Sequence, residues 1–206
     1  MNCDPQNIFS LCSLNAQSLH AKFTEIKNFI HTLNVDHQVL DILTISESWV
    51  KDFSLYNIDN YNLFGSSRPS GRGGGTAIYI HNSSTAKQVN NPIFFVPNIF
   101  EATVLEGNLK GKFKFLLVSI YRPNNHELLS TGAQIEEFLL QLEICLNFLD
   151  NKKKPVIFAG DFNLDLLKSN DVNDSSTKLL ELFMIFGYIQ TISKATRITN
   201  NSFSII

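Results

Sequence analysis

Cysteine is scarce in this sequence, and its few cysteines are scattered. Only Cys3, Cys12 and Cys145 occur among the 206 residues. Three cysteines this far apart form neither a disulfide framework nor the closely spaced ligand set of a structural zinc site. The sequence therefore argues against a small disulfide-stabilised fold, and we expect an intracellular, reducing location.

Long hydrophobic runs and an excess of charge are also missing. No apolar run reaches the length that a bilayer crossing needs, and the start, MNCDPQNIFS, has no basic segment of the kind that opens a signal peptide. The formal net charge is −2. A protein that binds nucleic acid through phosphates usually has a basic face, so charge by itself argues weakly against such binding.

What is present is the composition of a globular α/β domain. Hydrophobic residues make up 44% of the chain, which is enough for a sizeable core in one domain spanning 1–206. Strands are predicted by apolar or alternating runs at 8–14, 42–46, 76–80, 100–106, 112–121 and 156–160. Apolar residues at helical spacing predict helices near 17–33 and 135–150 and around 179–186, with Gly187 as a C-cap. Gly107 and Asn108 are predicted to begin a turn.

The segment PVIFAGDFNLDLL, residues 155–167, contains an unusual junction. An unbroken apolar run ends at Gly160 and leads directly into Asp161 and Asn163. Such a run is typical of a strand that is covered on both faces, and open α/β sheets place their sites at the carboxyl ends of such strands. An equally good interpretation is that Asp161 forms an Asx-turn that ends the strand.

Polar residues recur at the ends of four predicted strands. They are Asn15, Glu47, Tyr121, Asp161 and Asn163. Carboxylates with amides suit a hard cation such as Mg²⁺, which takes oxygen ligands and often only one or two from protein. They also suit phosphate chemistry, in which a carboxylate orients water. We expect these side chains to converge on one cleft.

Five motifs in order resemble a known family: LNAQSL, SESW, GGGTAIYI, SIYRPN and GDFNLD. The chain resembles the endonuclease/exonuclease/phosphatase superfamily, and within it the apurinic-endonuclease-like domain of non-LTR (LINE-type) retrotransposons. The resemblance implies a four-layer α/β sandwich (DNase I-like) with two facing mixed sheets and outer helices. It implies a Mg²⁺-dependent phosphodiesterase, with Mn²⁺ as a substitute, that nicks DNA to leave a 3′-hydroxyl for reverse transcription.

The resemblance also assigns roles to the residues at the strand ends. Glu47 resembles the principal metal ligand, with Asn15 beside it. Tyr121 resembles the tyrosine that contacts the scissile phosphate. Asp161 resembles the aspartate that orients or deprotonates the attacking water, and Asn163 the amide that holds phosphate and aspartate in place. Each residue also has a purely structural interpretation: a solvated loop acid for Glu47, a helix cap for Asn15 and a strand aromatic for Tyr121.

Three further segments bear on the family likeness. Thr196, in KATRIT, resembles a hydroxyl that lines the site. SGRGGG, residues 70–75, is interpreted as a mobile loop that enters the strand 76–80, and Arg68 and Arg72 either touch a DNA backbone or are simply solvated. His126, close to YRPNN, is interpreted as a surface-loop residue and matches no family histidine.

The family pattern also continues beyond this sequence. Its last strands and its active-site histidine, held by an aspartate, lie beyond Ile206, so the resemblance implies a domain that is incomplete at its C-terminus. We expect the 206-residue chain to be weakly active or inactive.

Three functions compete at this point. The first is a DNA-nicking endonuclease of a retrotransposon polyprotein, with a reverse transcriptase domain downstream, DNA as its partner and the nucleus as its place of action. The second is a repair endonuclease or phosphatase of the same superfamily, because one fold hosts many functions. The third is a catalytically dead remnant that only binds.

Overall fold

The computed structural model describes residues 9–36, 38–71, 73–123, 131–166, 174–194, 196–199 and 202–204, with several side chains near the C-terminus left out. Contacts divide the chain into two compact units. The first unit comprises Met1–Asn91, Glu101–Tyr121 and Pro155–Gly160, and the second comprises Pro92–Phe100, Arg122–Lys154 and Asp161–Ile206. Each unit is described by itself.

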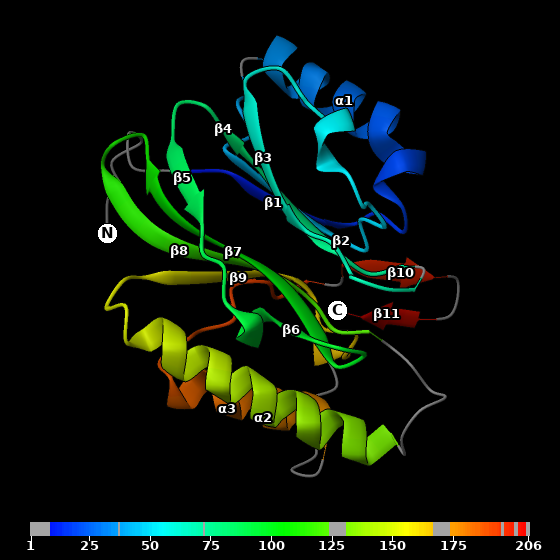
Figure 1. Ribbon diagram of the computed structural model, residues 1–206, viewed down its shortest axis with the longest axis vertical. Helices are drawn as coiled ribbons and strands as arrows, with labels where there is room; N and C mark the ends of the chain where they lie inside the picture. The colour runs from blue at the N-terminus through cyan, green and yellow to red at the C-terminus, as the bar shows by residue number, and fades with distance from the viewer. Residues whose placement is uncertain are drawn as a thin grey trace. The chain divides into compact units, whose positions relative to one another are not determined.

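The first unit contains a mixed four-stranded sheet with the order β1-β2-β4-β3 (Figure 1). Its strands are β1 (Leu11–Asn15), β2 (Ile42–Ser46), β3 (Tyr61–Ser66) and β4 (Thr76–His81). Strands β1 and β2 are parallel, whereas β4 is antiparallel to both β2 and β3. The parallel pair brings the carboxyl ends of β1 and β2 to the same edge of the sheet.

Helix α1 (Leu19–Val35) covers the outer face of this sheet (Figure 1). Ser18 caps it by accepting a hydrogen bond from the backbone N–H of Ala21. The helix buries Leu19, Ile26 and Ile30 in one cluster with residues of β2 and β4. The apolar residues at helical spacing therefore form the buried face of a helix, as their period predicted.

A second sheet in the first unit has the order β5-β7-β8-β9. These strands are β5 (Thr85–Gln88), β7 (Phe100–Leu109), β8 (Phe113–Tyr121) and β9 (Val156–Asp161). Strand β7 is antiparallel to both β5 and β8. Leu116 N–H bonds to Pro155 O, and Arg122 N–H bonds to Asp161 O. The residue numbers of the bonded partners therefore rise in the same direction along both strands. Strands β8 and β9 are therefore parallel, and this sheet is mixed as well.

The two sheets face each other, and the polarity of the layer between them changes along the strands. At one end the packing is apolar and joins Ile42, Ile78 and Ile80 to residues of β7 and β8. Towards the carboxyl end of β2 the same face carries buried hydroxyls, and Thr76 and Thr103 hydrogen-bond across the layer at 2.8 Å. The sandwich thus becomes more polar towards the end that carries the candidate site residues.

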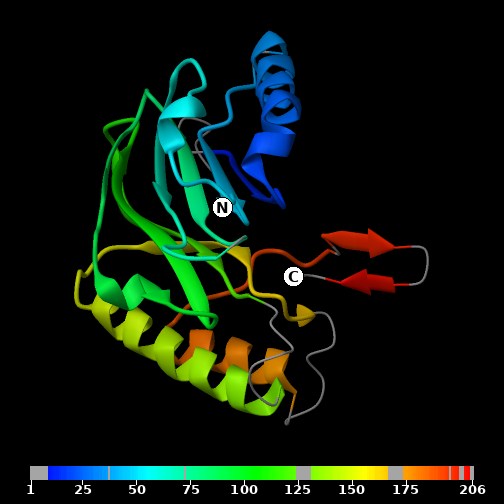
Figure 2. The same ribbon diagram turned by 45° about the vertical axis from the view of Figure 1, so that its right-hand side comes forward.

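The second unit is built mainly from two helices, α2 (Thr131–Asp150) and α3 (Ser175–Ile185), which lie side by side (Figures 1 and 2). Helix α3 ends in a Schellman motif, because Gly187 N–H bonds to Met184 O and Tyr188 N–H bonds to Phe183 O. Gly187 adopts a φ of 79°, so the predicted C-cap is confirmed. The unit also contains β6 (Phe95–Val96), β10 (Arg197–Thr199) and β11 (Ser202–Ser204). Short 3₁₀ turns occur at Phe53–Leu55 in the first unit and at Pro92–Phe94 in the second.

The predicted α/β class, with two mixed sheets and helices, is confirmed, but one predicted turn is wrong. Gly107 and Asn108 lie inside β7, and the chain reverses instead at 110–112. A Cβ on Gly107 would lie 2.7 Å from the ring of Phe115. This glycine therefore makes room for a buried aromatic ring and does not form a turn.

Candidate functional site

Two predicted residues meet where the parallel strands β1 and β2 end. Asn15 is the last residue of β1 and is paired with Ser46, the last residue of β2, so Glu47 follows at the same edge. The Asn15 side-chain amide donates a hydrogen bond of 2.7 Å to Glu47 Oε1. The Asn15 oxygen accepts from the backbone N–H of Gln17, and the cap of α1 is Ser18, so Asn15 bonds to Glu47 and does not cap the helix.

The Glu47 carboxylate is held by two N–H donors. Besides Asn15 at Oε1, the indole Nε1–H of Trp49 donates to Oε2 at 3.3 Å. Trp49 is thus packed beside the Glu47 loop. Glu47 and Trp49 adopt φ values of 52° and 55°, which non-glycine residues rarely do. Left-handed backbone at two such residues indicates a loop whose shape is imposed by its surroundings.

The surroundings of this loop are the glycine-rich segment before β4. Ser48 N–H bonds to Gly75 O at 3.0 Å, and Trp49 N–H bonds to Gly74 O at 2.9 Å. Gly75 N–H in turn donates to the carboxylate of Glu101. Arg68, for which a DNA contact was one interpretation, forms an ion pair with Glu101, and Arg72 lies outside the described residues.

Tyr121 ends β8 and lies in the first unit with Glu47. Its Cα partner in the sheet is Glu101 of β7, and its side chain is buried. Sequence reasoning missed Glu101, which is only 2% exposed. The signal for Glu101 was a carboxylate at the start of the apolar strand FEATVLE. Its partners Arg68 and Gly75 are distant in sequence, so this signal did not reveal the contacts.

Asp161 and Asn163 meet in the second unit. Asp161 is buried, and its Oδ1 accepts a hydrogen bond of 2.8 Å from the backbone N–H of Asn163. This is the Asx-turn that the sequence allowed. The turn does not rule out a catalytic role, because it presents Asp161 in a fixed orientation at the end of a strand.

Arg122 completes this second group of residues and was not predicted as part of it. Its guanidinium donates to the carbonyls of Phe162 and Asn163, at 2.6 and 2.7 Å. The Asn163 amide returns a bond of 2.7 Å to Arg122 O. The guanidinium carbon also lies 5.7 Å from the centre of the Phe138 ring. The signal was the motif SIYRPN, in which the arginine directly follows Tyr121.

The donor chemistry around Glu47 fits a hard divalent cation. A carboxylate oxygen that accepts one hydrogen bond can still bind a cation, and Mg²⁺ is often held by one or two carboxylates, with water and substrate supplying the rest. Among the described residues, we find no group of three or more His, Cys, Asp or Glu side chains arranged for a metal. The Glu47 carboxylate, to which the Asn15 amide donates, is therefore a candidate metal ligand and not a complete metal site.

Thr196 and His126 were also singled out in the sequence. Thr196 is exposed and lies just before β10, and His126 falls outside the described residues. The prediction that all the strand-end residues share one cleft stays a prediction.

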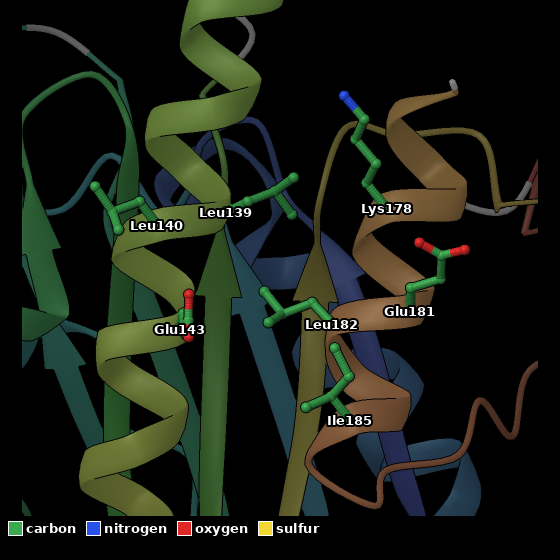
Figure 3. Close-up of a pocket in the computed structure, with 7 residues that line it drawn as sticks. All are labelled: Leu139, Leu140, Glu143, Lys178, Glu181, Leu182 and Ile185. Carbon is green, nitrogen blue, oxygen red and sulfur yellow. The ribbon is translucent and has the colours of Figure 1, made fainter. Parts of the chain in front are cut away.

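A separate groove runs between α2 and α3 in the second unit (Figure 3). It contains none of the predicted residues; it is lined by Leu139, Leu140, Glu143, Lys178, Glu181, Leu182 and Ile185. In the part of the chain that the structure describes, no helix has the length and hydrophobicity that a membrane crossing requires.

Comparison with known proteins points to one family. The family model described as "Endonuclease/Exonuclease/phosphatase family" matches residues 7–201. No curated protein matches the chain in sequence.

Solved structures with the same fold share little sequence with this chain. The AP endonuclease LMAP from Leishmania major has a TM-score of 0.63 and 16% identity, over 88% of this chain and 68% of that one. The 3′ phosphatase NExo from Neisseria, bound to a product DNA hairpin, has a TM-score of 0.60 and 14% identity, over 87% and 71%. The APE2 catalytic domain from Xenopus laevis has a TM-score of 0.57 and 17% identity, over 83% and 66%.

Proposed function

We propose that this chain, which belongs to the endonuclease/exonuclease/phosphatase family, hydrolyses phosphodiester bonds in DNA with the help of a divalent metal ion. Family membership indicates a hydrolase of the phosphodiesterase or phosphatase type. The observation that carries the proposal is the Glu47 carboxylate, fixed between Asn15 and Trp49 at the carboxyl ends of two parallel strands. DNA as substrate is supported by the five ordered motifs and by NExo, which shares the fold and was solved with product DNA.

In this proposal the first unit holds the metal. Glu47 would bind Mg²⁺ or Mn²⁺ directly, and the Asn15 amide, which donates to Oε1, would hold the carboxylate in position. When bound, the metal polarises a phosphoryl oxygen and neutralises charge that develops on it. Tyr121, fixed opposite Glu101 in the second sheet, would contact the scissile phosphate.

The second unit supplies the group that acts on water. Asp161 would accept a proton from the attacking water, since its carboxylate is held in place by the backbone N–H of Asn163. Arg122 fixes the following turn by binding two of its carbonyls. A general base acts only from a well-defined position, so this bracing is part of the proposed chemistry.

We further propose that the product is a nick with a 3′-hydroxyl, used to prime reverse transcription. The support is the order of the motifs LNAQSL, SESW, GGGTAIYI, SIYRPN and GDFNLD, which resembles that of retrotransposon endonuclease domains. A reverse transcriptase domain would then be the partner, and the nucleus the place of action.

A panel of three DNA substrates tests the proposal: supercoiled plasmid, a duplex with one abasic site and an oligonucleotide with a 3′-phosphate. Each is incubated with the chain in Mg²⁺ or EDTA. We expect weak Mg²⁺-dependent nicking of plasmid, in keeping with the low activity expected from the sequence, and a rate that Asp161→Asn lowers further, on the order of 10²- to 10⁴-fold. The control is Asp150→Asn, which changes an exposed acid of the same unit.

The pattern across the panel separates the alternatives. Cleavage confined to the abasic duplex favours a repair endonuclease, and loss of the 3′-phosphate alone favours a phosphatase; either result would contradict plasmid nicking as the function. If no substrate is processed in Mg²⁺ or Mn²⁺, the enzymatic proposal is wrong.

A further inference from the structure

A buried ion pair lies next to the Glu47 loop. The guanidinium of Arg68 places Nη2 2.5 Å and Nε 2.6 Å from Glu101 Oε1. The side chain of Glu101 is 2% exposed and that of Arg68 16%. The other carboxylate oxygen, Oε2, accepts the backbone N–H of Gly75. Glu101 is therefore bonded to a side chain and to the glycine segment at once.

The glycine segment is packed between Arg68 and the Glu47 loop. A Cβ on Gly74 would lie 2.5 Å from the Arg68 guanidinium, and a Cβ on Gly75 would lie 2.6 Å from Ser48 Oγ. Both glycines have positive φ, 67° and 79°. A side chain at either position would displace the arginine or the loop, so close packing requires glycine here.

This packing reaches Glu47 through the backbone. The carbonyls of Gly74 and Gly75 accept the N–H groups of Trp49 and Ser48, the residues that directly follow Glu47. The left-handed backbone at Glu47 and Trp49 costs free energy that surrounding contacts must offset. These contacts are the bonds to Gly74 and Gly75, and the Gly75 N–H is in turn bonded to the carboxylate of Glu101.

We infer that Arg68 and Glu101 are positioning residues that fix the Glu47 carboxylate for its metal through Gly74, Gly75 and Trp49. The inference rests on the proposed function, in which Glu47 binds the metal. A buried ion pair adds little stability beyond what apolar side chains of the same volume would give, because desolvation offsets the attraction. Its geometry, by contrast, sets the position of both partners, because two guanidinium N–H groups converge on Oε1 while the Gly75 N–H holds Oε2.

The single tryptophan of the chain makes this inference testable without catalysis, since Trp49 bonds to Glu47 and to Gly74. In Arg68→Met we expect acrylamide to quench Trp49 fluorescence more strongly than in the wild type. We expect the Mg²⁺ affinity, read from the same fluorescence, to weaken on the order of 10- to 100-fold, as for other groups that orient metal ligands. Arg68→Lys, which keeps the charge but lacks the fork, should recover part of the loss.

Lys110→Met is the matched control. Lys110 Nζ lies 2.8 Å from Asp41 Oδ1, and this acid is also buried, with 3% of its side chain exposed. The variant likewise leaves a buried carboxylate without its cation. It should lower thermal stability but leave both Trp49 readouts as in the wild type, because the Asp41 side chain bonds to Ser10 and Lys110, and neither belongs to the Glu47 loop.

A double variant guards against unfolding. If Arg68→Met fails to fold, Arg68→Met combined with Glu101→Leu removes the buried charge and should restore the fold. Its Trp49 readouts should still differ from those of the wild type. The inference is overturned if the folded variant matches the wild type in quenching and in Mg²⁺ affinity, or if Lys110→Met changes them equally. If the wild type neither binds Mg²⁺ nor cleaves DNA, the proposed function fails, and acrylamide quenching still decides whether the ion pair positions the loop.

Discussion

At the scale of single residues, Asn163 combines a left-handed backbone conformation with a side-chain hydrogen bond. It adopts a φ of 49°, a conformation that asparagine tolerates better than most residues. Its amide Nδ2 donates to Arg122 O at 2.7 Å. The residue therefore contributes a backbone preference and a hydrogen bond, and two substitutions separate them.

We predict that Asn163→Ala lowers the free energy of unfolding by about 1–3 kcal/mol, because it combines left-handed strain with a lost hydrogen bond. Asn163→Gly loses the same bond without the strain, so it should cost less. Urea unfolding of both variants measures the two effects. Equal destabilisation by alanine and glycine would show that the backbone conformation carries no cost.

Individual contacts between residues are also what the sequence predicts least well. Asp161 and Glu47 were found because each follows an apolar strand. Glu101 and Arg122 were missed because their partners lie far away in sequence: 33 residues for Arg68–Glu101 and 41 for Arg122–Asn163. Such pairs depend on which residues of two strands lie opposite each other, and a local sequence pattern does not give this register.

At the scale of elements, the contact between β8 and β9 depends on Gly160. A Cβ at this position would lie 1.9 Å from Ile120 O, which is backbone and has little room to move. The glycine also has a φ of 142°. It therefore allows close approach of two strands immediately before Asp161.

We predict that Gly160→Ala destabilises the protein on the order of 3–5 kcal/mol or prevents folding. The matched control is Gly132→Ala in α2, where an added Cβ meets nothing within 4 Å. That change should stabilise by about 0.5–1 kcal/mol, since alanine is the better helix former. Thermal denaturation of the two variants should therefore shift in opposite directions, and a mild effect of Gly160→Ala would contradict the packing described.

Elements with a strong apolar period were predicted, and weakly patterned ones were missed. The sequence indicated β2, β4, β8, β9 and both long helices near their observed bounds. It missed β3, YNLFGS, which has a polar residue and a glycine inside it. A Cβ on Gly65 would lie 2.3 Å from the ring of Phe53, so this glycine, like Gly107, accommodates an aromatic ring. Sequence reasoning interpreted Gly107 as a turn residue.

At the scale of the whole molecule, two buried groups and one partly buried tyrosine link stability to alkaline pH. Burial raises the pKa of Cys145 from 9.0 to about 12. Burial, with smaller contributions from Asp150 and Cys145, raises the pKa of Tyr188 from 10.0 to about 12. Burial also raises the pKa of Tyr79. In each case folding favours the protonated form.

A raised pKa gives stability that is fully present below the unfolded value and is lost as pH rises through the folded one. We therefore predict that the free energy of unfolding is steady up to about pH 9 and falls steeply towards pH 12. Urea unfolding across this range measures it. Cys145→Ala should reduce the slope above pH 9, the ordinary pKa of a cysteine. A flat profile up to pH 12 would contradict the burial of these groups.

The central claim is that Glu47 holds a divalent metal with which the chain cleaves DNA. The most direct measurement is the initial rate of plasmid nicking as a function of Mg²⁺ concentration. We predict that Glu47→Gln lowers the maximal rate on the order of 10²- to 10³-fold and raises the Mg²⁺ concentration needed. Glu25→Gln, which removes an exposed acid of α1, should follow the wild-type curve. Nicking by Glu47→Gln with the wild-type rate and Mg²⁺ dependence would contradict the claim.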